Sequence, residues 1–194
     1  MAIQRDQRGA TLLELIVVIS IIGVIGATVS VFVKDPIDGY VESVRRASLT
    51  DAADAAIRRM ARDIRKALPN STRVRNPYPN SQCLEFIPTK TGGRYRAAVD
   101  VTATGDILNF VAADSSFNML GSNSDLPADQ QIQVNDVVVV YNLGLPGADA
   151  YAGDNTSQVL GVVDGAETTI SIAPKLFPLA SGGKRFHVIA GGEN

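Results

Sequence analysis

The first long feature of the chain is an uninterrupted apolar run from Leu15 to Val33 that contains no charged side chain. Only three of its side chains are polar: Ser20, Thr28 and Ser30. A helix from Leu12 to Val33 rises about 1.5 Å per residue and reaches roughly 33 Å, which exceeds the hydrocarbon thickness of about 30 Å. We therefore expect residues 10–33 to form a transmembrane helix, preceded by a short polar segment, residues 1–9.

A second helical pattern follows. Its apolar residues recur mostly at three- and four-residue steps: Val41, Val44, Ala53, Ile57, Met60, Ile64 and Leu68. Asp35-Pro36 predicts a kink or a short break, because proline lacks a backbone donor and clashes with the preceding turn. Pro69-Asn70-Ser71 predicts the end of the helix. We expect residues 34–68 to form an amphipathic helix that continues the first one.

Beyond Pro69 the pattern changes to short apolar runs with turn residues between them. The expected strands are Cys83–Ile87, Tyr95–Val101, Ile107–Val111, Asp136–Leu143, Gln158–Val163, Thr168–Ile172 and Arg185–Ile189. Thr91-Gly92-Gly93 and Thr104-Gly105-Asp106 are the expected turns. Four consecutive valines, residues 137–140, are typical of a strand buried on both faces. Residues 69–194 are thus predicted to form an antiparallel β-sheet domain.

Together these elements predict an α+β protein, in which a long N-terminal helix packs on an antiparallel sheet. The apolar stripe of the second helix is the natural cover for one face of the sheet. We expect Ile57, Met60 and Ile64 to be buried against strand residues such as Val138 and Val140.

Charge is distributed unevenly along the chain. Residues 36–68 carry seven basic and five acidic side chains, whereas residues 69–194 carry eight basic and twelve acidic ones. The acidic C-terminal part gives no electrostatic case for nucleic-acid binding. Five cations gather at the end of the second helix: Arg58, Arg59, Arg62, Arg65 and Lys66. A solvated helix face explains them better than a membrane-surface or partner patch.

Candidate chemistry is sparse. With Cys83 as the single cysteine and His187 as the single histidine, zinc sites and triads are poorly supplied. Asp149, Asp154 and Asn155 lie in an oxygen-rich loop, but their spacing does not match an EF-hand. We expect no catalytic residues, no metal and no cofactor, and therefore no enzyme.

Glu14 is the residue that does not fit the apolar segment. An unpaired carboxylate near a membrane centre costs about 2.5–3.5 kcal/mol on insertion scales. A secretory signal peptide does not explain Glu14, because such a peptide ends in its small-residue cleavage site and here Gly9 precedes the apolar run. Cleavage between Gly9 and Ala10 would place a new amine at the helix start, able to pair with Glu14 of a neighbouring helix. The alternative is an ordinary anchor whose glutamate reaches the interface.

At these residues the chain resembles the type IV prepilin family. The match comprises a short basic leader ending in Gly9, then Ala10, Thr11, Leu12 and Glu14, with Ala10 at a position that is usually Phe. The resemblance implies a pilin-like fold, leader cleavage after Gly9 by a prepilin peptidase, and N-methylation of Ala10 by the same class of enzyme. From the charge argument above, we hypothesise that Glu14 docks an incoming subunit against the N-terminus of an assembled neighbour.

A stripe of small residues within the apolar helix is a candidate packing face. Ser20, Gly23, Ala27 and Ser30 follow steps of three, four and three residues, so they share one side of the helix. Small side chains allow close approach of another helix in a membrane. Glycine is also common in membrane helices without such a role.

The resemblance continues into the second helix and the sheet. Segments 44–65, 84–88, 92–96 and 177–181 resemble the minor pilins of the mannose-sensitive haemagglutinin (MSHA) pilus, in particular the O-type. This implies an inner-membrane, single-pass protein with a periplasmic head, assembled into a surface pilus. The implied partners are membrane lipid, the prepilin peptidase/N-methyltransferase, other major and minor pilins, and the inner-membrane assembly machinery.

Two alternatives stay open. Minor pseudopilins of type II secretion share such motifs, and a membrane-tethered periplasmic binding protein or enzyme is the alternative from a different class. The resemblance also implies further sheet and another cysteine beyond residues 185–189, so the chain is either a shortened member or a truncated sequence. Cys83 then either lacks its partner or is a buried free thiol.

Overall fold

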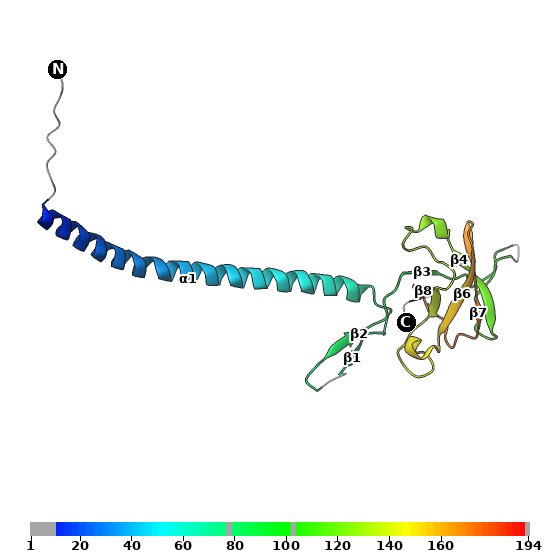
Figure 1. Ribbon diagram of the computed structural model, residues 1–194. Coiled ribbons are helices and arrows are strands. Elements are labelled where there is room, and N and C mark those ends of the chain that lie inside the picture. Colours follow the sequence, from blue (N-terminus) through cyan, green and yellow to red (C-terminus); the bar gives the residue numbers. More distant parts are fainter. Residues whose placement is uncertain (1–10, 77–78, 102–103, 193–194) are drawn as a thin grey trace, which may run out of the picture. The chain divides into compact units, whose positions relative to one another are not determined.

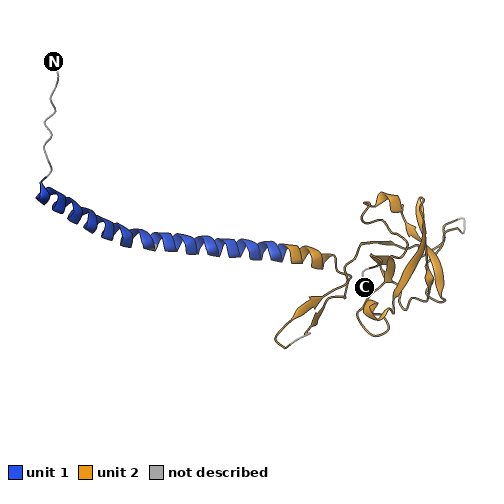
Figure 2. Cartoon of the chain, in the orientation of Figure 1, with its two compact units in different colours: residues 1–58 blue, residues 59–194 orange. Residues whose placement is uncertain are grey.

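The computed structural model describes residues 11–76, 79–101 and 104–192. The chain divides into two compact units, Met1–Arg58 and Arg59–Asn194, which Figure 2 shows in different colours. Unit 1 holds most of a single long helix, α1 (Leu12–Arg65), and unit 2 holds its last turns and every strand of the described residues. The predicted α+β class is confirmed.

α1 passes through Pro36 without ending. Its ribbon is continuous there and curves gently over the N-terminal half (Figure 1). The expected short break is therefore absent. A proline removes one hydrogen bond from the helical ladder, and a bend accommodates the loss while the bonds on either side persist.

The helix ends at Arg65, three residues earlier than the expected Leu68. The backbone N–H groups of Lys66 and Ala67 donate to carbonyls three residues back, which tightens the last turn. Leu68 follows beyond the helix, and its N–H donates to the carbonyl of Ile87 at 2.7 Å. It is the one residue of the predicted apolar stripe that is buried, at 1% exposure.

Unit 2 contains two sheets. The small one pairs β1 (Arg73–Arg75) with β2 (Cys83–Glu85) in antiparallel register. The large one has six antiparallel strands in the order β3-β8-β5-β6-β7-β4 (Figure 1). Their bounds are β3 Thr91–Arg94, β4 Asp114–Leu120, β5 Val137–Val140, β6 Thr156–Val163, β7 Glu167–Lys175 and β8 Arg185–Ile189. Two 3₁₀ turns, η1 (Asn123–Asp125) and η2 (Ala150–Ala152), lie in the connections.

The six-stranded sheet curls until its two edge strands, β3 and β4, approach each other. A bridge joins Tyr95, just after β3, to Met119 of β4, and the N–H of Arg96 donates to the carbonyl of Asn118 at 2.8 Å. The Arg96 guanidinium also pairs with the carboxylate of Glu167 on β7. The sheet therefore closes on itself at this seam, which removes a stretch of free edge.

Closure gives unit 2 a core made by the sheet and its connections. The buried cluster consists of Tyr95, Leu108, Phe117, Met119, Ile132, Val138, Val140, Val159, Ile170, Ile172, Phe177, Phe186 and Val188. The rings of Phe117 and Phe186 meet edge to face with centroids 5.3 Å apart. Val138, Val139 and Val140 are all fully buried, so the predicted burial of this strand on both faces is confirmed for them.

The predicted cover of the sheet by the helix stripe is wrong. Met60 and Ile64, which lie in unit 2 with the sheet, are 54% and 36% exposed. Val138 and Val140 are buried among residues of the curled sheet instead. A sheet that closes on itself covers its own inner face, so these valines need no helix over them.

Five of the seven expected strands form, as β2, β5, β6, β7 and β8. The expected strands 95–101 and 107–111 do not form, and β1, β3 and β4 were not expected. The predicted turn at Gly92-Gly93 lies inside β3. A Cβ at Gly92 would stand 2.9 Å from the carbonyl oxygen of Phe186, and one at Gly93 2.8 Å from Met119 Sδ. These glycines serve close approach rather than a turn.

Candidate functional site

The start of α1 brings two of the motif residues together. Thr11 Oγ1 accepts a hydrogen bond from the backbone N–H of Glu14 at 3.3 Å, and the Thr11 carbonyl accepts one from Leu15 N–H at 3.2 Å. The first N–H groups of a helix have no partner within the helix, so Thr11 acts as the N-cap. Glu14 lies three residues further on, in the first turn of α1, where its negative charge interacts favourably with the positive end of the helix dipole.

Thr11 is a functional residue that the sequence analysis named only as part of the motif. The threonine–x–x–glutamate spacing is the signature of a capping box, in which Thr and Glu side chains satisfy backbone donors reciprocally. Glu14 therefore has a local reason to occupy its position, in addition to any contact with a neighbouring chain. A variant at Glu14 has to separate these two roles.

The residues after Glu14 satisfy the demands of a lipid environment. Among the described residues, α1 is the one helix that is both long enough and apolar enough to cross a membrane. The Ser20 hydroxyl donates to the Ile16 carbonyl at 2.8 Å, and the Thr28 hydroxyl donates to the Val24 carbonyl at 2.6 Å. The helix thus satisfies both hydroxyls internally, as a segment surrounded by hydrocarbon requires.

The small-residue face of Ser20, Gly23, Ala27 and Ser30 is exposed along its whole length in unit 1. A Cβ built at Gly23 meets no atom within 4 Å, so the described chain gives this glycine no intramolecular packing role. The role of the face in helix packing stays a prediction.

Gly9 and Ala10 lie outside the described residues. The cleavage point, the site of methylation and the pairing of an Ala10 amine with Glu14 therefore remain predictions from the sequence. What the structure adds is the first helical turn that follows them, capped by Thr11.

The acidic loop residues of unit 2 have structural partners. Asp154 Oδ2 accepts from the backbone N–H groups of Gly147 at 2.9 Å and Asp149 at 3.2 Å. Asp149 Oδ1 accepts from Tyr151 N–H and caps η2. No group of three His, Cys, Asp or Glu side chains able to hold a metal ion occurs in the residues searched, 11–76, 79–101 and 104–192.

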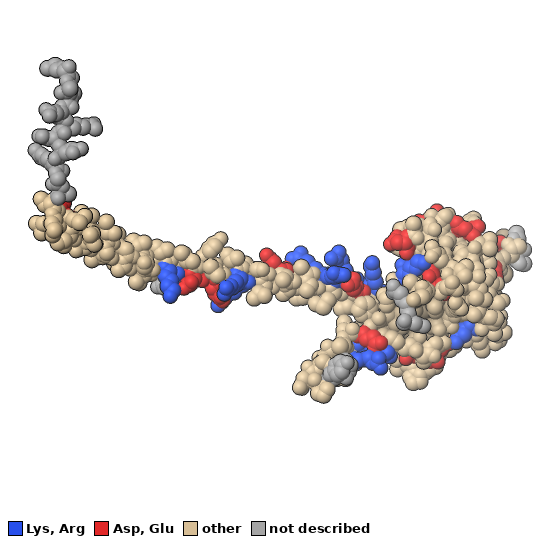
Figure 3. Space-filling view, viewed as in Figure 1, with Lys and Arg blue, Asp and Glu red and all other residues tan. Residues whose placement is uncertain are grey.

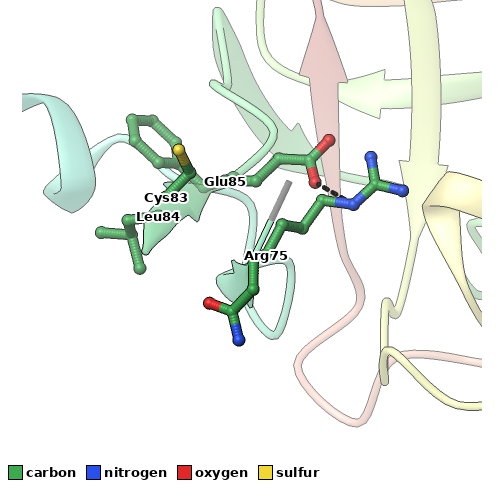
Figure 4. A pocket seen from close by; sticks show the side chains of 6 residues that line it. Arg75, Cys83, Leu84 and Glu85 are labelled. Atoms are coloured by element: carbon green, nitrogen blue, oxygen red, sulfur yellow. Dashed lines mark ion pairs between the residues drawn. The ribbon is translucent and has the colours of Figure 1, made fainter. Parts of the chain in front are cut away.

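A small hollow lies on the β1–β2 hairpin, with Arg75, Cys83, Leu84 and Glu85 in its lining (Figure 4). Glu85 pairs with Arg73 at 2.9 Å and with Arg75 at 3.5 Å. The hydrogen bond from Arg73 and the two positive charges hold the pKa of Glu85 below its ordinary value. The Arg73 guanidinium also lies over the Tyr151 ring, 3.4 Å from its centroid. A carboxylate engaged in this way braces the hairpin and is a poor general base.

Cys83 is exposed, so the expectation of a buried free thiol is wrong. Cys83 lies on the two-stranded sheet, where each strand has one partner and little of the backbone is covered. Among the described residues, the Cys83 thiol and the half-buried His187 of β8 are not hydrogen-bonded to each other.

Comparison with known proteins supports the N-terminal segment as the functional site. The family model described as the prokaryotic N-terminal methylation motif matches residues 4–30. No curated protein and no solved structure matches the chain. The matched segment contains Gly9, Ala10 and Glu14 together with most of the predicted membrane span. Residues 4–30 are thus an N-terminal methylation motif of the type IV prepilin kind, and they mark the chain as a pilin- or pseudopilin-like protein.

Proposed function

We propose that this chain is a minor type IV pilin of the MSHA class, similar to its O-type subunit, with a structural and initiating role in pilus assembly. The observation that carries the proposal is the methylation motif, in which Gly9 ends a basic leader and Glu14 opens a membrane-spanning helix. A simple membrane anchor for an enzyme or binding protein needs neither residue. The minor MSHA role rests on the resemblance of segments 44–65, 84–88, 92–96 and 177–181.

The proposed life cycle begins in the inner membrane. Arg5 and Arg8 favour retention of the leader on the cytoplasmic side, so the C-terminal sheet domain enters the periplasm. A prepilin peptidase removes residues 1–9 and methylates the amine of Ala10. The processed subunit then joins other pilins through the assembly machinery.

Glu14 has the docking role in this proposal. Within one chain, the Ala10 amine and the Glu14 carboxylate are about 6 Å apart along the helix axis, since a helix rises about 1.5 Å per residue. Adjacent subunits offset along a filament bring the two groups together more easily. Such a pair removes the cost of two isolated charges in lipid and sets the register between subunits.

The first experiment measures processing. The full chain is expressed in cells with a prepilin peptidase, and its intact mass is determined from membranes. The expected product starts at Ala10 and carries a methylated amine. Gly9→Leu is expected to insert but stay uncut. Wild-type chains that retain residues 1–9 in cells that cleave a known prepilin would contradict the pilin assignment.

The second experiment separates the charge of Glu14 from its place in the capping box. Glu14→Gln retains a side chain that can complete the box but lacks the negative charge, and Glu14→Leu lacks both. Both variants are expected to insert and be cleaved normally, and both are expected to fail in assembly. Glu14→Asp, with a shorter reach, is expected to be partly defective. Wild-type piliation with Glu14→Gln would show that the residue acts only in capping.

A minor pseudopilin of type II secretion is the alternative, because the matched motif supports both assignments equally. Complementation distinguishes them. The gene is supplied to a strain lacking its own minor pilins and, in parallel, to one lacking its minor pseudopilins. Restored pili with unchanged protein secretion support the pilus role, and the reverse result supports the secretion role.

A further inference from the structure

The last turns of α1 carry a basic face that has no ionic partner within its own chain. Arg59, Arg62, Arg65 and Lys66 lie at three- and four-residue steps in unit 2, and Figure 3 shows Lys and Arg gathered at this end of the helix. Over the described residues 11–76, 79–101 and 104–192, no carboxylate lies within ion-pair distance of these four. By contrast, Arg46 and Arg58 pair with acids one turn earlier, at 2.9 and 2.7 Å.

The basic face lies opposite the exposed apolar side chains of the same turns. Arg62 is two residues from Met60 and two from Ile64, a rotation of about 200° around the helix in each case. A surface that covers Met60 and Ile64 therefore leaves the basic face directed away from it. A partner that binds the four cations must therefore be anionic and must differ from the surface that covers Met60 and Ile64.

A membrane surface does not fit as this partner. From Val33, the end of the apolar run, to Arg58, both in unit 1, α1 rises about 37 Å at about 1.5 Å per residue. The basic face begins at the next residue. The Debye length at physiological ionic strength is about 8 Å, so lipid headgroup charge is screened well before this point.

Unit 2 also carries an acidic corner, defined as Asp125 of η1 and Asp164 of the β6–β7 turn. Asp164 accepts hydrogen bonds from the Ser122 hydroxyl at 2.8 Å and from the backbone N–H groups of Asn123 and Ser124 at 2.7 and 3.2 Å. The Ser124 and Ser122 hydroxyls, with further help from the Asn123 N–H and the Thr168 hydroxyl, hold the pKa of Asp164 well below its ordinary value, so the carboxylate stays ionised. Asp125 is exposed beside it, and neither has a cation within ion-pair distance among the described residues.

We propose that the basic face of one copy docks on the acidic corner of a second copy. The two patches are charge-complementary, and a single head-to-tail contact between them is heterologous. Heterologous contacts whose rotation does not close propagate as open chains, which is the geometry that a filament subunit needs. The inference rests on the proposed function for its biological meaning, but association of copies can be measured independently of processing.

Asp129 provides an internal reference. It lines the same groove as Arg65 and Lys66 within unit 2. A carbodiimide joins a carboxylate directly to a lysine amine and leaves no spacer between them. Lys66 is the member of the basic face that this reagent can link.

The experiment mixes ¹⁴N and ¹⁵N full-length chains in zwitterionic detergent, treats them with carbodiimide and identifies linked peptides by mass. We expect mixed-isotope links from Lys66 to Asp125 or Asp164. Links from Lys66 to Asp129 within one isotope, across the groove that both residues line, would show only that the reagent reached the site. Lys66 links confined to one isotope, or association that requires added anionic lipid, would overturn the proposal.

Charge reversal gives the second readout. Arg62→Glu and Asp125→Lys are each expected to weaken association about tenfold in sedimentation at low salt. The double variant is expected to recover most of the loss, because both charges are then inverted. Arg45→Glu, on the same helix but outside the face, is the matched control and is expected to leave association unchanged.

Equal loss in the double variant, or the same loss in the control, would overturn the contact. The leader-cleavage assay is run on the same variants. Cleaved chains whose copies do not associate contradict this inference alone, whereas wild-type chains that associate but are never cleaved contradict the proposed function alone.

Discussion

Tyr95 lies at the seam where the curled sheet closes, and its hydroxyl ties this seam to the β7–β8 connection. The side chain is 1% exposed. Its hydroxyl donates to the Ser181 carbonyl at 3.2 Å and accepts from the Ser181 N–H at 3.1 Å. Tyr95→Phe removes one oxygen atom and retains the ring that packs in the core. Any loss of stability therefore reports on these two hydrogen bonds.

The magnitude follows from the fate of each Ser181 group. The Ser181 carbonyl still accepts from the Lys184 N–H at 3.0 Å, so it keeps a partner. The Ser181 N–H loses its acceptor, and Ser181 is only 8% exposed. An orphaned buried donor costs about 1–3 kcal/mol, so we expect Tyr95→Phe to lower the free energy of unfolding by that amount.

The assay is chemical denaturation of the full chain in detergent, followed by hydrogen exchange in residues 181–189. Tyr141→Phe is the control, because Tyr141 is 42% exposed and its hydroxyl makes no hydrogen bond within the described residues. We expect a lower midpoint and faster exchange for Tyr95→Phe only. Two variants that unfold alike would refute the argument that this hydroxyl holds the β7–β8 connection in place.

Three further predictions concern unit 2. Burial, aided by Arg185, lowers the pKa of His187 below its ordinary value, so the unfolded chain binds a proton more readily than the folded chain. The neutral His187 therefore contributes its full stability above about pH 6.5, and this contribution falls as the pH drops toward the lowered pKa. In His187→Gln the urea midpoint should change less between about pH 7.5 and 5.5 than in the wild type. Gly93→Ala would place a Cβ 2.8 Å from Met119 Sδ and should cost about 1–3 kcal/mol, whereas Gly182→Ala, with open space, should leave the melting temperature unchanged. Met60→Ala should change the free energy of unfolding by less than about 0.5 kcal/mol, because Met60 is exposed, and a loss of 2 kcal/mol would show that it is covered.

The pattern of apolar residues predicted the strands in which these residues are consecutive or alternate regularly along the sequence. The valines of β5 and the bounds of β8 follow directly from it. It missed β4, Asp114–Leu120, because the residues that face outward there are serines and asparagine and only Phe117 and Met119 reach the core. It mistook Gly92-Gly93 for a turn, because the close approach of Phe186 and Met119 that requires glycine is a tertiary contact.

The candidate site divides in the same way. Gly9 and Glu14 are identifiable from sequence because each contradicts its surroundings, a small residue before an apolar run and a charge within one. The Thr11–Glu14 spacing also predicts a helix cap at Thr11. The cap was not predicted because the helix was expected to begin one residue earlier, at Ala10. The acidic corner could not be predicted, since three of the four donors around Asp164 come from the β4–β5 connection, far earlier in the chain.

The curled sheet has a consequence for the function of the helix. Because the inner face of the sheet is covered by its own strands, Val138 and Val140 need nothing from α1. The apolar and basic side chains of the last helical turns are consequently not committed to the fold of the sheet domain, as the exposure of Met60 shows. Substitutions on these turns can therefore alter association while the sheet domain stays folded. Stability and assembly are thus separable in this chain, and a Met60 or Arg62 variant that abolishes assembly at an unchanged unfolding midpoint locates a subunit contact rather than a folding defect.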